Sequence, residues 1–170
     1  MIQVLVSSCL LGKTVRYNAS DAPCDKKILS QWQNEGRLIH FCPEFAVGFP
    51  IPRPPAEIAG GDGKMVLSGQ VKVIENTGMD VTKKFVEGAK KTCDFAIEMD
   101  VKIAILTDGS PSCGSTFVYD GNFTGKQISG KGVTTELLEQ NGIRIFNENQ
   151  IEDALVLLKS LDVSEAENAI

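Results

Sequence analysis

The chain has 170 residues, of which 42% are hydrophobic and 23% charged, and its formal net charge is -5. This composition is typical of one globular domain with a sizeable core, and the N-terminus lacks the features of a signal peptide. No apolar run approaches the ~20 residues that cross a bilayer, and the negative charge argues against a nucleic-acid interface. We therefore expect a cytoplasmic protein that binds a small molecule and has no membrane partner.

The first part of the chain predicts a strand, a helix and a second strand. The apolar run at residues 2–8 indicates the first strand. Asp25 is a suitable N-cap for a helix over residues 26–35, and residues 38–41 form the second strand. A strand–helix–strand unit of this length favours two parallel strands joined by a right-handed crossover.

A proline-rich stretch follows, in which five of the seven prolines lie between Pro43 and Pro55. Repeated proline makes the backbone stiff and extended. The stretch is either a surface loop, with the character of an SH3-type ligand, or a rigid wall beside Cys42. Its start directly after Glu44 favours the wall. Beyond it, we expect a small hairpin or edge strand over residues 64–73.

The second half alternates helices and strands. Asp80 is a good N-cap for a long helix to Met99, whose apolar residues recur at helical spacing. The remaining predicted elements are a strand at 101–106, a short hairpin from 116, a helix at 133–140, a strand at 143–146 and a helix at 151–160. Together they predict an α/β fold, a three-layer sandwich with a mainly parallel, Rossmann-like sheet. We assign residues 1–160 to a single domain and residues 161–170 to a frayed acidic tail.

Three of the five cysteines fall just past the ends of predicted strands: Cys9, Cys42 and Cys113. Ligands of open α/β sheets bind outside the carboxyl ends of the strands, so we expect these thiols to meet at one edge. Cys93 lies on the apolar stripe of a helix and is expected to be a packing residue. Cys24 is expected to be a half-buried thiol, with a fourth ligand as the alternative.

Three converging thiols allow several interpretations. A zinc site usually shows close cysteine pairs, which are absent, and His40 is the only histidine that could complete it. An iron–sulfur cluster suits soft thiolate ligands and would keep one iron open. A nucleophilic Cys113 has no second histidine to act as its base. The fourth alternative is that all five cysteines only pack in the core.

Polar residues near the same edge are candidates for chemistry. Glu44 lies two residues after Cys42 and could move protons or activate water. Ser110 and Ser112 flank Pro111 and could hydrogen-bond a sulfur or a substrate. Arg16 and Arg53 could orient an oxygen-rich substrate. Each also has an ordinary structural explanation, as a surface or turn residue.

Six motifs in the same order resemble the YbbK-type bacterial family, which includes the thiouracil desulfurases. The resemblance spans residues 2 to about 146. The motifs are Ser7-Ser-Cys-Leu-Leu-Gly12, Val15-Arg-Tyr-Asn18, Cys42-Pro-Glu44, Pro50-Ile-Pro-Arg-Pro-Pro-Ala-Glu57, Gly78-Met-Asp-Val-Thr82 and Ser110-Pro-Ser-Cys-Gly114.

The resemblance implies a [4Fe-4S] cluster bound by Cys9, Cys42 and Cys113, with Glu44 and Ser110 as catalytic residues. It further implies a non-redox desulfidase that converts a small thio-compound such as 2-thiouracil to uracil and hydrogen sulfide. The alternative is a non-catalytic metal- or cluster-binding protein, such as a sulfur carrier or sensor. The chain departs from the family at residues 106–109, where relatives often have a lysine, and we expect any difference in substrate to arise there.

Overall fold

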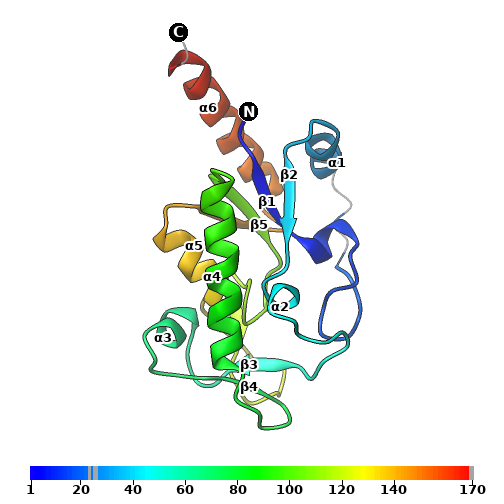
Figure 1. Ribbon diagram of the computed structural model, residues 1–170, viewed down its shortest axis with the longest axis vertical. Coiled ribbons are helices and arrows are strands. Elements are labelled where there is room, and N and C mark those ends of the chain that lie inside the picture. Colours follow the sequence, from blue (N-terminus) through cyan, green and yellow to red (C-terminus); the bar gives the residue numbers. More distant parts are fainter. Residues whose placement is uncertain (23, 25–26, 169–170) are drawn as a thin grey trace.

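Four short strands form a parallel sheet at the centre of the computed structural model, which describes residues 1–22, 24 and 27–168 (Figure 1). The sheet order is β2-β1-β5-β8, and every neighbouring pair is parallel. All residues of β1 and β5 are buried, as expected for central strands covered on both faces. The strands are β1 (Val4–Ser7), β2 (Leu38–Phe41), β5 (Ile103–Leu106) and β8 (Arg144–Asn147).

Two pairs of helices cover the two faces of this sheet. Alternation along β1 places Val4 and Val6 in one core with the first pair, and Leu5 in a second core with the other pair. The predicted α/β architecture with a mainly parallel sheet between helical layers is therefore confirmed. The first pair is α1 (Lys27–Asn34) and α6 (Ile151–Asn168), and the second is α4 (Thr82–Glu98) and α5 (Val133–Gln140).

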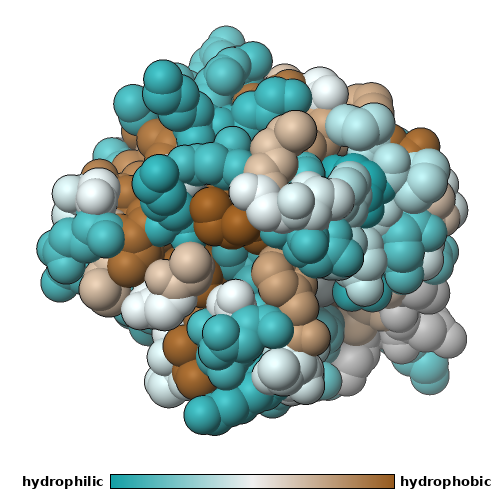
Figure 2. Space-filling model, turned by 90° about the horizontal axis from the view of Figure 1, so that it is seen from below, coloured by the Kyte–Doolittle hydropathy of each residue, from teal (hydrophilic) through white to brown (hydrophobic). Residues whose placement is uncertain are grey.

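A third core lies beyond the carboxyl edge of the sheet, at the lower end of Figure 1. Helix α4 reaches it with Phe85 and Ala89, while the other half of the same helix packs on the sheet. Seen from this end, the surface shows small hydrophobic patches separated by hydrophilic residues (Figure 2). The elements here are α3 (Gly63–Leu67) and two antiparallel ribbons, β3 (Ala56–Ile58) with β4 (Val73–Glu75) and β6 (Phe117–Tyr119) with β7 (Gln127–Ser129).

The predicted hairpin over residues 64–73 is wrong. The Asp62 side chain accepts a hydrogen bond from the Met65 backbone N–H at 3.1 Å, and this cap starts helix α3 instead. An edge strand does form just beyond, but β4 pairs with β3 from the end of the proline-rich stretch. Two segments more than a dozen residues apart thus make the ribbon that was expected to be local.

The two ends of the chain also differ from expectation. Helix α6 continues to Asn168, so residues 161–168 are helical rather than frayed, and residues 169–170 lie outside the described residues. Helix α1 is described from Lys27, so the expected cap Asp25 and residue 26 lie outside the described residues too. In the described part of the chain, none of the helices combines the length and apolar character that a bilayer span requires.

Candidate active site

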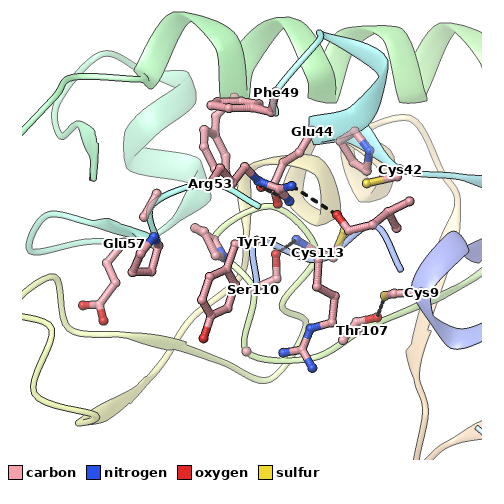
Figure 3. A pocket seen from close by; sticks show the side chains of 18 of the residues that line it. Cys9, Tyr17, Cys42, Glu44, Phe49, Arg53, Glu57, Thr107, Ser110 and Cys113 are labelled. Atoms are coloured by element: carbon pink, nitrogen blue, oxygen red, sulfur yellow. Dashed lines mark hydrogen bonds and ion pairs between the residues drawn. The ribbon is translucent and has the colours of Figure 1, made fainter. Parts of the chain in front are cut away.

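Three adjacent strands, β2, β1 and β5, end at one cavity of about 480 Å³ (Figure 3). Cys9 lies in the single turn η1 (Ser8–Leu11) that follows β1. Cys42 lies between β2 and the short helix α2 (Pro43–Ala46). Cys113 follows β5 in the Ser-Pro-Ser-Cys turn. The structure thus brings the three cysteines to one cavity, because parallel neighbours present their carboxyl ends at the same edge.

The proline-rich stretch forms one side of this cavity. Four of its residues line the cavity, which favours the rigid-wall interpretation over a surface ligand: Phe49, Arg53, Pro54 and Pro55. Residues of the two ribbons line the cavity next to this stretch, among them Ala56 and Glu57 of β3 and Tyr119 of β6. Glu57 holds the turn between β6 and β7 there, because its Oε2 accepts the backbone N–H groups of residues 121 and 123 at 2.9 Å and 3.1 Å.

A buried arginine, Arg53, pairs with the half-buried Glu44 in the cavity wall. Arg53 Nε and Nη2 both lie 2.7 Å from Glu44 Oε2, and the Arg53 Nη1 group donates to the Val15 carbonyl oxygen at 3.1 Å. Among the described residues no donor reaches Glu44 Oε1, so this oxygen is left for a ligand. Burial raises the pKa of Glu44 above its usual value, although the Arg53 charge works in the opposite direction.

Burial is also the largest influence on the pKa values of the three cavity thiols. It raises the pKa of the Cys113 thiol well above its usual value, and the nearby Cys42 and Cys9 raise it further. The pKa values of Cys9 and Cys42 are raised by burial too. Three buried thiolates side by side are costly unless a cation compensates their charge. The arrangement therefore favours a positively charged centre bound between them.

Asp108 organises the turn that carries Cys113. Its Oδ1 accepts the backbone N–H groups of Gly109, Ser115 and Thr116 at 3.0, 2.8 and 3.1 Å. Burial alone would raise the pKa of Asp108, but these bonds and that of the Thr116 hydroxyl hold it below the usual value. This role of Asp108 was not predicted, and its only signal in the sequence is an Asp-Gly step one residue after a strand.

Ser110 completes the same turn. Its Oγ accepts the backbone N–H groups of Ser112 and Cys113 at 3.1 Å and 3.2 Å, so its own hydrogen remains available to donate into the cavity that it lines. One side chain thus both fixes the backbone at Cys113 and presents a hydroxyl beside it.

Residues 4–150 match the sequence model of the family described as 2-thiouracil desulfurase. The chain belongs to the 2-thiouracil desulfurase family. It is 47% identical over 152 residues to "Uncharacterized protein YbbK" of Bacillus subtilis (strain 168), a match that covers 89% of this chain and 99% of that protein. It also resembles the solved structure of the [4Fe-4S]-dependent thiouracil desulfidase TudS, with a TM-score of 0.86, 38% identity and coverage of 94% of this chain and 99% of that one. The resemblance stated from the motifs is confirmed.

The donor set of this desulfurase-family chain is three cysteine thiols at one cavity, and thiolates are the soft ligands that hold iron–sulfur clusters. Among the described residues, no group of three or more His, Cys, Asp or Glu side chains is placed to hold one metal ion. His40 is exposed, with Nδ1 3.2 Å from Ser8 Oγ, and it does not line the cavity.

Two expected substrate contacts need revision in this family member. Ser112 is buried, and its Oγ lies 3.0 Å from Thr134 Oγ1 rather than in the cavity lining, because the turn rotates it toward α5. Arg53 lines the cavity, but its N–H groups are largely used by Glu44 and the backbone, so it positions Glu44. Arg16 lines the cavity near Cys9 and remains a predicted substrate contact. Cys24 is half-buried, with its sulfur 3.7 Å from the Glu148 carbonyl oxygen.

Gly132 is required by the close approach of α5 to the cysteine turn. A Cβ at this position would lie 2.4 Å from the Ser112 carbonyl oxygen and 2.8 Å from the Cys113 nitrogen. We expect Gly132→Ala to lower the free energy of unfolding by about 2 kcal/mol, as overpacking does. Urea denaturation measures this. The control is Gly130→Ala, whose Cβ would meet Asp62 and Val118 side-chain atoms at 3.2 Å and 3.3 Å. If both variants have the same free energy of unfolding as the wild type, the close approach of Gly132 to the cysteine turn is contradicted.

Cys93 lies where a packing residue was expected. It is 4% exposed in α4, within the core between this helix and the sheet. Cys93→Ala removes one sulfur from that core, so we expect a loss of about 1 kcal/mol in the free energy of unfolding and unchanged iron content. Urea denaturation and iron analysis of the anaerobically prepared protein measure the two quantities, and a loss of iron would show that the assignment to the core is wrong.

Proposed function

We propose that this protein is an iron–sulfur-dependent desulfidase that removes sulfur from a thiolated pyrimidine such as 2-thiouracil, giving uracil and hydrogen sulfide. The observation that carries the proposal is the convergence of Cys9, Cys42 and Cys113 on one cavity that also holds Glu44 and Ser110. Membership of the 2-thiouracil desulfurase family and the resemblance to TudS, which is described as [4Fe-4S]-dependent, support it.

In this proposal the three cysteine thiolates hold a [4Fe-4S] cluster. With only three protein ligands, the cluster would supply one iron that acts as a Lewis acid on the carbon–sulfur bond of the substrate. The reaction exchanges sulfur for the oxygen of one water molecule: thiouracil and water give uracil and hydrogen sulfide. No electrons are gained or lost, so neither an oxidant nor a reductant is needed.

Glu44 moves the protons of the attacking water. Its free oxygen, Oε1, accepts the first proton and passes it to the departing sulfur; the second proton leaves the new hydroxyl as the carbonyl forms, and it completes hydrogen sulfide. Arg53 fixes the carboxylate through Oε2, so Oε1 keeps one orientation toward the cavity. Burial that raises the pKa of Glu44 makes its carboxylate a stronger base than an exposed glutamate.

Ser110 orients the substrate. Because its Oγ already accepts two backbone N–H groups, its hydrogen is donated to an acceptor atom of the pyrimidine ring. The aromatic side chains of Tyr17, Phe49 and Phe123, together with the prolines, provide apolar area around a flat ring.

Activity should depend on pH through Glu44. A general base must be ionised, so kcat should fall as the pH decreases through the Glu44 pKa, which lies above the usual 4.5. The pH–rate profile of the iron-loaded enzyme, with iron content checked at each pH, measures this acidic limb. In Glu44→Gln the residual rate should lack the limb, and persistence of the same limb in that variant would assign it to another group.

The test of the proposed function compares metals. The protein is purified without oxygen and reconstituted either with iron and sulfide or with zinc, and each form is incubated with 2-thiouracil. We expect uracil and sulfide from the iron form alone. Turnover by the zinc form, or stoichiometric zinc uptake with no iron uptake, would contradict the proposal and favour a different metal-binding role.

A further inference from the structure

Thr107, the first residue after β5, contacts a cysteine sulfur directly. Its Oγ1 lies 2.9 Å from Cys9 Sγ, and both residues are buried (Figure 3). In the free thiol either atom is able to donate. A cysteine that ligates a metal has lost its proton, so in that state the Thr107 hydroxyl must be the donor.

The backbone of the same residue reaches a second cysteine through Ser7. The Thr107 N–H donates to Ser7 Oγ at 3.2 Å. Ser7 is itself buried, and its hydroxyl hydrogen-bonds the Cys113 thiol, where it opposes the rise in pKa that burial causes. One residue is therefore connected to two of the three cysteines, to Cys9 by its side chain and to Cys113 through Ser7.

Within the described part of the chain, the hydrogen bonds to the third cysteine come from the backbone. The N–H groups of Glu44 and Phe45, in the first turn of α2, lower the pKa of the Cys42 thiol against the effect of burial. At Cys9 and Cys113, by contrast, a side-chain hydroxyl of a described residue reaches the sulfur. Of these two hydroxyls, that of Thr107 has a defined distance to its sulfur, 2.9 Å from Oγ1 to Cys9 Sγ.

We propose that Thr107 is a positioning residue that donates a hydrogen bond to the Cys9 sulfur and thereby sets the reduction potential of the bound cluster and its lifetime in air. This inference rests on the proposed cluster. A hydrogen bond to a ligand sulfur stabilises negative charge, which is greater in the reduced cluster, so the bond raises the reduction potential. Since desulfuration needs no electron transfer, a raised potential protects the cluster from oxidation without altering the reaction.

The experiment compares two substitutions in the anaerobically reconstituted protein. Thr107→Val keeps the shape of the side chain and removes the hydroxyl, while Thr107→Ser keeps the hydroxyl. Reduction potentials are measured by a redox titration followed by electron paramagnetic resonance, and cluster lifetime by decay of the visible absorbance in air. We expect a lower potential and a several-fold shorter lifetime in Thr107→Val, with both values restored toward the wild type in Thr107→Ser.

The matched control is Thr92→Val, which removes a buried hydroxyl that donates to the Gly88 carbonyl oxygen at 2.7 Å within α4. Its potential should equal that of the wild type. A wild-type potential in Thr107→Val would overturn the inference. A folded Thr107→Val protein that binds no iron, with iron restored by Thr107→Ser, supports it. If both Thr107→Val and Thr107→Ala are unfolded by circular dichroism, the hydroxyl holds the fold and the inference fails.

The same experiment separates this inference from the proposed function. A wild-type protein that takes up no iron contradicts both. An iron-loaded wild type that converts 2-thiouracil, with an unshifted potential in Thr107→Val, contradicts only the role of Thr107.

Discussion

Glu44→Gln should lower kcat on 2-thiouracil by about 10²- to 10⁴-fold while leaving the iron content unchanged, because the amide has the size of the carboxylate but accepts no proton. The substitution keeps an oxygen that can accept from Arg53, which is 4% exposed at its side chain. Alanine would leave that arginine buried and unpaired, at a cost of about 3–5 kcal/mol. The glutamine variant therefore tests the loss of the proton acceptor without the loss of stability that an unpaired Arg53 would cause.

The matched control is Glu87→Gln, which removes an exposed carboxylate that pairs with Lys91 on α4. Initial rates of uracil formation, normalised to iron, measure the effect in both variants. We expect the wild-type rate in Glu87→Gln. A wild-type rate in Glu44→Gln, with iron bound, would show that another group activates the water.

Replacing any one of Cys9, Cys42 and Cys113 with alanine should abolish stable iron binding and with it all activity. Each thiolate is one of three protein ligands, and the cavity offers no other thiol among the described residues to replace it. Iron and acid-labile sulfide are measured after anaerobic reconstitution and gel filtration.

Cys24→Ala and Cys93→Ala provide controls with the same chemical change. Cys93 lies in the core and Cys24 lies outside the cavity lining, so both variants should bind iron as the wild type does. Full iron binding in one of the three cavity variants, or its loss in Cys24→Ala, would show that the ligand set is wrong.

The elements with a strong local pattern could be predicted from the sequence. The expected bounds of β2 and α5 agree with the structure, because an apolar run between polar turns and a helix between Gly132 and Asn141 are local signals. The ribbon of β3 and β4 could not be predicted in the same way. Its strands have three residues each, and their pairing depends on contacts distant in the sequence.

The candidate site, too, could be predicted only in part. The three cysteines and Glu44 follow predicted strands, so their common edge could be inferred from chain order. The hydrogen bonds of Asp108 and Thr107 depend on how the turn after β5 folds back, which no periodicity encodes. Ser112 was misplaced for that reason, since the turn that exposes Ser110 rotates the next serine toward Thr134.

We propose that this protein replaces the sulfur of a thiolated pyrimidine with oxygen from water at its three-cysteine site. The most direct measurement incubates the iron-loaded protein with 2-thiouracil in ¹⁸O-labelled water, without reductant, and quantifies uracil and sulfide. We predict equal amounts of the two products and one ¹⁸O atom in each uracil. An iron-loaded protein that leaves 2-thiouracil unchanged, or forms uracil without the label, would contradict the account.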